Sequence, residues 1–300
     1  MRHIVVVGSL NMDLVTQADR FATPGETLLG QHFNTFMGGK GANQAVAAAR
    51  LGAKVSLIGA VGDDAFGAEL LQGLRHEGVH HDAVVVLPHH HTGIASITVA
   101  DADNHIIVVA GANHALTPAH ILAQADTIRA ADVVLCQLEI PLATVHTVAQ
   151  LCHEAQVPFM LNPAPAQPLP DSLWPYINYL TPNEHELDLI SQVPNTADMA
   201  ERLSALPTTV VMTHGKRGAY YLNDQHQAVL QPSFAVHAID STGAGDTFNA
   251  AFAVYLDQGV ADAVRHACAA GAMAVTQLGA QAGMPTAAAL AAFINTHSPV

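Results

Sequence analysis

The sequence predicts an α/β fold in which a doubly wound, mostly parallel sheet is flanked by helices and carries a small β lid. Two observations lead to this prediction. Short runs rich in β-branched residues alternate with helical patterns along most of the chain, and one stretch breaks the alternation with three β-rich runs that no helix separates. Strands joined through helices run parallel in one sheet, whereas strands joined only by turns pair antiparallel.

The predicted strands of the main sheet are short apolar runs, which are typical of strands buried on both faces. They lie at residues 3–8, 54–62, 131–137, 157–163 and 208–215. Helical patterns fall between them and dominate the C-terminal part of the chain. They lie at residues 41–51, 64–77, 141–155, 183–190, 243–257, 260–275 and 286–296. Gly259 would separate two of these helices, because glycine readily adopts the backbone conformation that ends a helix.

The lid is predicted from two segments that do not follow the alternation. Residues 84–110 contain three β-rich runs separated by turn residues, and residues 10–37 are similarly irregular, with a turn at TPGE. We expect both segments to supply antiparallel strands to a small β sheet on the α/β body. No linker, repeat or low-complexity tract divides the sequence, so we expect a single domain over residues 1–300.

Composition excludes several classes of partner. The chain carries a net charge of −14 with only 12% charged residues, which argues against non-specific binding of nucleic acid. No apolar run approaches the roughly 18 residues that suggest a membrane span, and the apolar start is too short for a signal peptide. The three cysteines, Cys136, Cys152 and Cys268, form no CxxC pair and are expected to be reduced, buried thiols. We therefore expect a soluble, cytoplasmic protein with neither nucleic acid nor membrane as a partner.

Histidine is unusually frequent, with 19 residues and runs at 80–81 and 89–91. A metal site needs ligands at a defined spacing and geometry, and these runs do not provide one. Exposed loops explain the runs better.

Two glycine-containing segments are candidates for binding an oxygen-rich ligand. GGKGANQAVAAARLG, at residues 38–52, places three glycines before a strong helix former, so a helix N-terminus can come close to a ligand. A tight turn before a well-packed helix explains this segment equally well. DSTGAGD, at residues 240–246, leaves its backbone amides open before another helix. Neither segment fits the P-loop or the dinucleotide-binding pattern.

Polar residues also follow several predicted strands. Asp13, Glu139, Asn183 and Asp240 all come after strand-like runs, and open α/β sheets bind ligands at the carboxyl ends of their strands. Together they predict a shared cleft, although Asn183 alone reads equally as a helix cap. The segment at 213–218 either touches phosphates or forms a plain hairpin.

DSTGAGD also predicts a catalytic arrangement. Its small residues allow the amides of Gly243, Ala244 and Gly245 to point at the N-terminus of the following helix, where they would form an anion hole. Asp246 lies in the first turn of that helix, where its carboxylate would serve as a general base. The alternative is that Asp246 only stabilises the helix dipole.

These segments resemble the PfkB-type carbohydrate kinase family, and its ribokinase branch in particular. The two family signatures are GGKGANQA and DSTGAGDTF, and TPGET, GDDAFG, GANHAL, LNPAPA and TPNE extend the resemblance over essentially the whole chain. The resemblance implies a ribokinase-like fold and ATP-dependent phosphorylation of the 5-hydroxyl of D-ribose, giving D-ribose 5-phosphate and ADP. A related kinase acting on 2-deoxyribose, a nucleoside or a ketohexose is the alternative. A non-catalytic sugar-binding sensor on the same fold is another.

The resemblance also implies which residues bind each ligand. The sugar would be held by Asn11, Asp13, Gly39, Lys40, Gly41, Asn43 and Glu139, with Asp246 at the reacting hydroxyl. The nucleotide would be held by Asn183, Thr213, His214, Gly215, Lys216, Gly218, Gly245 and Cys268. Cys268 departs from the Asn or His expected there, and a thiol cannot reproduce their hydrogen bonds.

Two metal ions and a second subunit are implied in the same way. A monovalent cation, usually potassium, would be bound by Asp240, Thr242, Ala274, Gln277, Gly279 and Gly283. Magnesium would accompany ATP, held mainly by its phosphates and by water. The lid would cover the sugar and join two copies of the chain into a homodimer.

Overall fold

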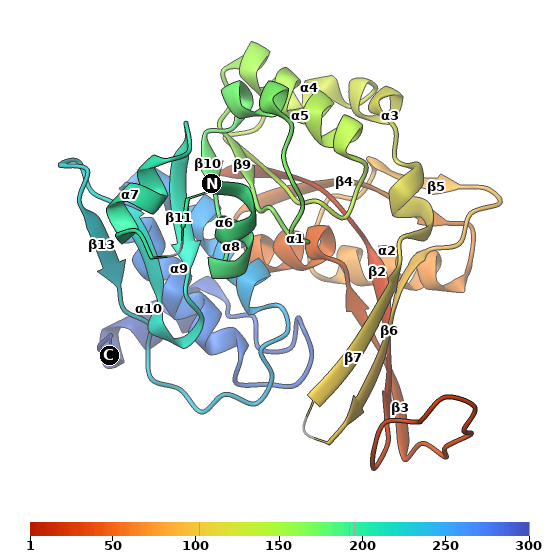
Figure 1. Ribbon diagram of the computed structural model, residues 1–300. Helices are drawn as coiled ribbons and strands as arrows, with labels where there is room; N and C mark the ends of the chain where they lie inside the picture. The colour runs from red at the N-terminus through yellow and green to blue at the C-terminus, as the bar shows by residue number, and fades with distance from the viewer. Residues whose placement is uncertain (102, 192, 195, 300) are drawn as a thin grey trace.

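The computed structural model describes residues 1–101, 103–191, 193–194 and 196–299 of the 300-residue chain. Its centre is a nine-stranded sheet with the strand order β13-β12-β11-β10-β9-β8-β1-β4-β5 (Figure 1). The strands are β1 (His3–Val7), β4 (Lys54–Gly62), β5 (Val84–Leu87), β8 (Val133–Cys136), β9 (Phe159–Leu161), β10 (Tyr179–Leu180), β11 (Thr209–Thr213), β12 (Ala219–Leu222) and β13 (Ala228–Gln231). Neighbours from β11 to β5 run parallel, and only β12 and β13 at one edge are antiparallel. The predicted mostly parallel sheet is confirmed.

Helices cover both faces of this sheet. One face carries α1 (Lys40–Arg50), α2 (Ala65–His76), α8 (Ala244–Tyr255), α9 (Val260–Ala274) and α10 (Ala287–Thr296). The other carries α3 (Pro118–Leu122), α4 (Ala125–Arg129), α5 (Leu142–Ala155), α6 (Glu184–Ser191) and α7 (Met199–Ser204). Because side chains alternate along a strand, Ile4 and Val6 of β1 enter one core and Val5 and Val7 enter the other. This burial on two sides confirms the doubly wound fold and explains the uninterrupted apolar runs.

The chain changes direction across the sheet between β1 and β8. From β1 it proceeds to β4 and β5 on one side, whereas from β8 it proceeds through β9 and β10 to β11 on the other. The loops that leave β1 and β8 therefore diverge and open a crevice at the carboxyl ends of these two strands. Ligands of open α/β sheets bind at such a switch point.

A second sheet of four strands projects from the body as a lid (Figure 1). Its order is β3 (His32–Gly38), β2 (Asn11–Gln17), β6 (Gly93–Ala100) and β7 (Asp103–Val109). The hairpins β2–β3 and β6–β7 are antiparallel, as predicted, but β2 and β6 pair in parallel. They run the same way because both leave the same edge of the main sheet.

One run assigned to the lid belongs to the body instead. Residues 84–87, predicted as the first lid strand of the 84–110 segment, form β5 and pair in parallel with β4. The helix α2 between β4 and β5 makes an ordinary βαβ unit, which explains the parallel pairing. The lid contribution of this segment begins at β6.

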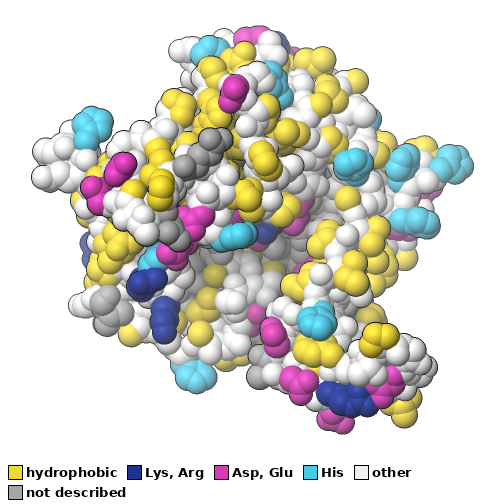
Figure 2. All heavy atoms as spheres, in the orientation of Figure 1, with side chains coloured by type: hydrophobic (Ala, Val, Ile, Leu, Met, Phe, Trp, Pro, Cys, Tyr) yellow, Lys and Arg dark blue, Asp and Glu magenta, His cyan; other side chains and the backbone are white. Residues whose placement is uncertain are grey.

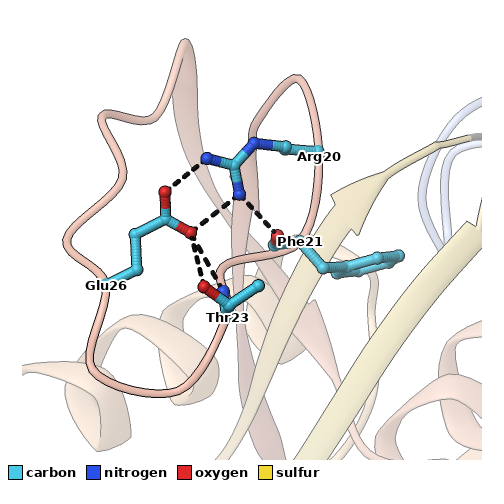
Figure 3. Close-up of polar contacts among 4 residues, drawn as sticks. All are labelled: Arg20, Phe21, Thr23 and Glu26. Atoms are coloured by element: carbon cyan, nitrogen blue, oxygen red, sulfur yellow. Dashed lines mark hydrogen bonds and ion pairs between the residues drawn. The ribbon is translucent and has the colours of Figure 1, made fainter.

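The loop at the tip of the lid is fixed by a cluster of polar contacts (Figure 3). The guanidinium of Arg20 donates to both carboxylate oxygens of Glu26, and Glu26 Oε2 also accepts from the backbone N (3.0 Å) and Oγ1 (3.1 Å) of Thr23. The ring of Phe21 stacks on His105 of β7, with 3.8 Å between ring centroids. The predicted TPGE turn is confirmed by the bond from Glu26 N to Thr23 O. These contacts attach the turn to the lid sheet.

Several short elements were given no residue range by the predictions. They are β10, β12, β13, α3, α4 and α7, none of which exceeds six residues. Elements of this length contain too little periodicity to be distinguished from loops.

The remaining predictions concern histidines, thiols and membrane spans. Residues 89–91 lie exposed after β5, and no group of three or more potential metal ligands occurs in the described part of the chain. All three cysteines are buried and free. Within the same described residues, the helices are all too short or too polar to cross a bilayer.

Candidate active site

The residues that follow β1 and β8 meet at the switch point through Glu139. Ser9 Oγ donates to Glu139 Oε2 at 2.5 Å, and the backbone N of Lys40, the first residue of α1, donates to the same oxygen at 3.2 Å. Glu139 therefore joins the ends of two strands to the N-terminus of a helix, where a carboxylate is favoured by the helix dipole.

Gly39 allows this helix to begin inside the crevice. Its φ of +87° is a conformation that residues with a side chain rarely adopt, and a Cβ there would lie 2.7 Å from the backbone N of Asn11. The glycines before α1 thus form the tight turn of one interpretation, and the same turn brings the helix N-terminus into the candidate site.

Asp13 lies within β2, at the base of the lid, rather than in a loop after β1. It is opposite Phe36 of β3 and Ala95 of β6. Burial, followed by the negative charges of Glu139 and Asp246, raises the pKa of Asp13 from 3.8 to about 7. Three carboxyl groups from distant parts of the sequence therefore lie within electrostatic reach of one another.

Asn11 is held nearby by a residue that sequence reasoning did not single out. Asn113 Nδ2 donates to Asn11 Oδ1 at 2.8 Å, while Asn113 Oδ1 accepts from the backbone N of Leu10 at 2.9 Å. Asn113 belongs to the GANHAL segment, and its buried amide fixes the start of β2.

Asp246 is buried in the first turn of α8, with 7% of its surface exposed. Its Oδ2 accepts from Asn43 Nδ2 at 2.9 Å and its Oδ1 from Gln44 Nε2 at 3.1 Å. Burial raises the pKa of Asp246 although Lys40 and these two amides favour the ionised form. Burial lowers the pKa of Lys40, but Asp246 and Glu139 outweigh this effect and raise it, so Lys40 is protonated. A carboxylate with a raised pKa beside a fixed cation is suited to accept a proton.

A pocket of about 210 Å³ opens beside Asp246. It is lined by Lys40, Asn162, Ala164, Thr181, Asn183, Glu186, Thr213, Ser241, Gly243, Gly245, Asp246 and Asn249. On the face shown in Figure 2, the surface is hollowed between the α/β body and the lid. The pocket therefore brings the predicted base Asp246 together with Asn183, Thr213 and Gly245, which were assigned to the nucleotide.

The N-terminus of α8 presents free amides to this pocket. Gly243 is the N-cap residue and supplies no side-chain cap. Among the described residues, the N–H groups of Gly243, Gly245 and Asp246 have no acceptor, whereas that of Ala244 donates to Ser241 O at 3.3 Å. Of the three amides predicted to form an anion hole, those of Gly243 and Gly245 are therefore without an acceptor among the described residues, whereas that of Ala244 closes the turn.

The residues predicted to bind the nucleotide divide into two groups. Asn183 caps α6 as one interpretation predicted: Glu186 N donates to Asn183 Oδ1 at 2.8 Å, and Asn183 N donates to Glu186 Oε2 at 2.8 Å. Asn183, Glu186 and Thr213 also line the pocket. The cap and the ligand interpretations are therefore compatible.

The loop after Thr213 forms the second group and lies outside the pocket lining. His214, Gly215 and Lys216 lie in the turn between β11 and β12, which confirms the hairpin. Gly218 closes this turn against β13, since a Cβ there would lie 2.0 Å from Gln231 O. Cys268 is buried in α9 with its Sγ 3.9 Å from the same carbonyl oxygen.

The candidate cation residues come together beside the 240–246 loop. Asp240 follows no strand, contrary to the prediction, and instead lies in the long loop between β13 and α8. Its Oδ1 accepts from Thr242 N (2.9 Å) and Oγ1 (2.7 Å), and its Oδ2 accepts from Gly279 N at 2.8 Å. Burial raises the pKa of Asp240, but these hydrogen bonds outweigh burial. The pKa is therefore lower than its ordinary value, and the carboxyl group is ionised.

Two more of the predicted cation ligands, Ala274 and Gly283, are in contact with each other. A Cβ at Gly283 would lie 2.1 Å from the carbonyl oxygen of Ala274, so only a glycine can pack this closely against Ala274. Gln277 is exposed on the turn that follows α9.

Sequence reasoning missed several polar residues of the site. They are Ser9, Gln44, Asn162, Thr181, Glu186, Asn249 and Gln281. Glu186 could have been found, because it is the third residue after Asn183 in a capping-box pattern. The others are single polar residues whose importance appears only when distant segments meet.

Comparison with known proteins gives consistent matches over almost the whole chain. Residues 1–287 match the model of the pfkB family carbohydrate kinases. The ribokinase of Bacillus subtilis (strain 168) is 47% identical over 288 residues, which cover 95% of this chain and 97% of that protein. The deoxyribokinase of Salmonella typhi is 34% identical over 295 residues, covering 94% and 95%. The solved structure of Arabidopsis thaliana ribokinase complexed with ribose and ATP superimposes with a TM-score of 0.89 at 32% identity, covering 97% of this chain and 98% of that one.

Proposed function

Because this chain belongs to the pfkB family of carbohydrate kinases, we propose that it transfers the γ-phosphoryl group of ATP to the 5-hydroxyl of D-ribose, giving D-ribose 5-phosphate and ADP. The observation that carries the proposal is Asp246, a buried carboxylate that faces the pocket from the N-terminus of α8. The identity to a ribokinase, 47%, exceeds the 34% to a deoxyribokinase and favours ribose as the sugar.

In the proposed reaction Asp246 accepts the proton of the 5-hydroxyl as that oxygen attacks the γ-phosphorus. The free N–H groups of Gly243 and Gly245 stabilise the charge on the transferred phosphoryl oxygens. Lys40 lies across the same pocket and balances this charge. Catalysis then depends on groups that are already in position before the substrates arrive.

The sugar would lie between the base of the lid and α1. Asp13 would accept hydrogen bonds from two vicinal hydroxyls, and Asn11, Asn43 and Glu139 would bind the remaining ones. Gly39 and Gly41 leave room at the helix N-terminus for the ring. A site built around a hydroxyl discriminates against a sugar that lacks it, because a buried polar group then loses its partner.

ATP would enter from the side of Asn183 and Thr213, with its phosphates towards Gly245. The base would lie near the turn that contains His214, Gly215, Lys216 and Gly218, and near Cys268. Magnesium fits this pocket, since Glu186 is a carboxylate lining it, and the ion would neutralise phosphate charge. Glu186 would hold it through water.

A potassium ion fits the oxygens beside Asp240. The carboxylate of Asp240 and the carbonyl of Ala274, which lies against Gly283, are hard oxygen donors of the kind that alkali cations prefer. Carbonyl oxygens of Thr242, Gln277 and Gly279 would complete the shell. The bound ion would fix the shape of the 240–246 loop.

The lid would also join two chains into a dimer. β3 and β7 are its edge strands, and β7 exposes Ile106, Ile107, Val108 and Val109, which leave between 51% and 68% of their surface in contact with solvent. Exposed edge strands with apolar side chains are normally covered by a partner. The free, buried cysteines favour a cytoplasmic location.

The experiment that tests the proposal is a sugar panel with ATP. D-Ribose, 2-deoxy-D-ribose, D-fructose and adenosine are compared by ADP release, and the phosphorylated position is identified by phosphorus NMR. We expect the highest kcat/KM with ribose and phosphate on its 5-oxygen. A higher value with another acceptor would reassign the substrate within the family, and sugar binding without ADP release would support the sensor alternative.

A further inference from the structure

Two chains of side-chain amides end on the two oxygens of Asp246. In the first, Gln281 Nε2 donates to Asn43 Oδ1 at 3.0 Å, and Asn43 Nδ2 donates to Asp246 Oδ2 at 2.9 Å. In the second, Gln137 Nε2 donates to Gln44 Oε1 at 2.6 Å, and Gln44 Nε2 donates to Asp246 Oδ1 at 3.1 Å. All five side chains are buried. The carboxyl group proposed as the base is therefore held from two directions.

The direction of each chain is imposed by the carboxylate. An ionised carboxyl group can only accept hydrogen bonds, so the amides of Asn43 and Gln44 must turn their NH₂ groups towards Asp246. Their carbonyl oxygens then point away and need a donor behind them. Gln281 and Gln137 provide these donors, and each of them fixes which way the next amide faces.

The two chains start from different parts of the fold. Gln137 directly follows β8, at the centre of the main sheet, which is a fixed anchor. Gln281 belongs to residues 279–283, the segment that touches the candidate cation site. Gly279 N donates to Asp240 Oδ2 at 2.8 Å, and a Cβ at Gly243 would lie 2.3 Å from Ala280 O. A change in this segment therefore reaches both the 240–246 loop and the side chain of Gln281.

The backbone of Gln281 is held independently of its side chain. Arg50 Nη1 donates to the carbonyl oxygens of Gln281 (2.5 Å) and Met284 (3.3 Å), and Arg50 forms a two-point ion pair with Glu77. Replacing the Gln281 side chain leaves all these contacts in place. The amide contact with Asn43 can thus be removed without releasing the segment.

We propose that Gln281 is a positioning residue that couples the segment at the candidate cation site to the base Asp246 through Asn43, while Gln44 holds the other oxygen from the rigid sheet. This inference rests on the proposed function, in which Asp246 is the base and a cation occupies the site at Asp240. The cation site would then act on the base in two ways. One is through the shape of the 240–246 loop, and the other is through the side chains of Gln281 and Asn43.

The alternative is that Gln281 only fills space, and two substitutions separate the possibilities. Gln281→Met keeps the length of the side chain and removes the donor. Gln281→Glu keeps the shape but, when ionised at pH 8.5, attracts the NH₂ group of Asn43 and turns its Oδ1 towards Asp246. Packing alone predicts that Glu is tolerated better than Met, whereas the amide chain predicts that Glu is the more harmful change.

The kinetic test measures kcat and KM for ribose in potassium and in tetramethylammonium at equal ionic strength. For Gln281→Met we expect kcat in potassium to fall about tenfold, the loss expected for one orienting hydrogen bond. The potassium response, which is the ratio of kcat in potassium to kcat in tetramethylammonium, should also fall, and only the part that acts through the 240–246 loop should remain. Gln44→Met should lower kcat similarly but keep the potassium response, because its chain starts in the sheet. Met284→Leu, a buried change directly after residues 279–283, is the control and should change neither.

A second readout does not require turnover. In ¹⁵N-labelled protein, the side-chain NH₂ resonance of Asn43 should move when potassium replaces tetramethylammonium, and this shift should be clearly smaller in Gln281→Met but retained in full in Gln44→Met. If the wild-type protein phosphorylates no sugar, the proposed function fails, and the Asn43 resonance still decides the coupling. An Asn43 resonance insensitive to potassium in the wild type, wild-type kinetics in Gln281→Met, or greater activity of Gln281→Glu than of Gln281→Met would each overturn the inference.

Discussion

Ribose binding should depend steeply on pH because of Asp13. Burial and two neighbouring carboxylates raise the pKa of Asp13 to about 7, so the free site holds this group largely protonated at pH 6. A carboxylate that accepts from two hydroxyls must be ionised. About a tenth of the sites are ionised at pH 6 and about nine tenths at pH 8, so the affinity for ribose should rise about tenfold between them.

Titration calorimetry can measure both this affinity and the proton that accompanies it. At pH 6.5, in buffers of different ionisation enthalpy, binding of ribose should release most of one proton as Asp13 ionises. The matched variant Asp13→Asn should bind ribose more weakly, with an affinity that is flat across this range and without proton release. A wild-type affinity that is equally flat would refute the assignment of Asp13 as the hydroxyl acceptor.

The same shift predicts the stability of the free protein. Between about pH 4 and pH 7 the unfolded chain has lost a proton that folded Asp13 still holds, so the free energy of unfolding should fall as pH rises through this window. The full shift from 3.8 to about 7 corresponds to at most about 4 kcal/mol. Denaturant titrations of Asp13→Asn should show a smaller decrease over the same range.

Three further predictions concern the cation, the lid and the thiols. Activity should increase when potassium replaces tetramethylammonium, and Gly283→Val should abolish this increase because its side chain would collide with Ala274 O; an equal response in both proteins would contradict the site. Light scattering should give the mass of a dimer for the wild type and of a monomer for Ile107→Asp, and a monomeric wild type would refute the lid interface. Burial raises the pKa of Cys152 and of Cys268 to about 12, so iodoacetamide at pH 8 should label them only after unfolding, and rapid labelling of the folded protein would contradict their burial.

The body of the fold was predictable from sequence because its strands and helices are long and regular. β1, β4 and α8 each present a continuous apolar run or a clear helical period. β5 was misassigned because four apolar residues next to a turn look alike in a lid hairpin and in a βαβ unit, and only the pairing with β4 distinguishes them. β10, with two residues, has no detectable period at all.

The residues of the candidate site that lie in glycine-containing segments were largely predictable from sequence. The buried glutamines that hold these residues in place were not. Asn43 and Asp246 lie in the two glycine-containing segments, and the structure joins them by a hydrogen bond across 203 residues of sequence. Gln44 follows Asn43 in the same segment, but its role and that of Gln281 were not predicted, because the function of a buried glutamine is recognised only from the partners that folding brings to it. Asp240 was expected after a strand, since a polar residue after apolar ones is common both at strand ends and in loops.

Replacement of Asp246 by asparagine tests the central claim most directly. Asparagine keeps the shape of the side chain and can still accept one of the two amide hydrogen bonds. The other hydrogen bond is lost, but removal of a buried charge offsets this loss. Folding and ribose affinity should therefore change little. Asp262→Asn, an exposed acid in the first turn of α9, is the matched control for a helix-dipole effect. If Asp246 is the base, kcat should fall roughly a hundredfold or more in Asp246→Asn and stay unchanged in the control. A kcat close to the wild-type value in Asp246→Asn would contradict the mechanism.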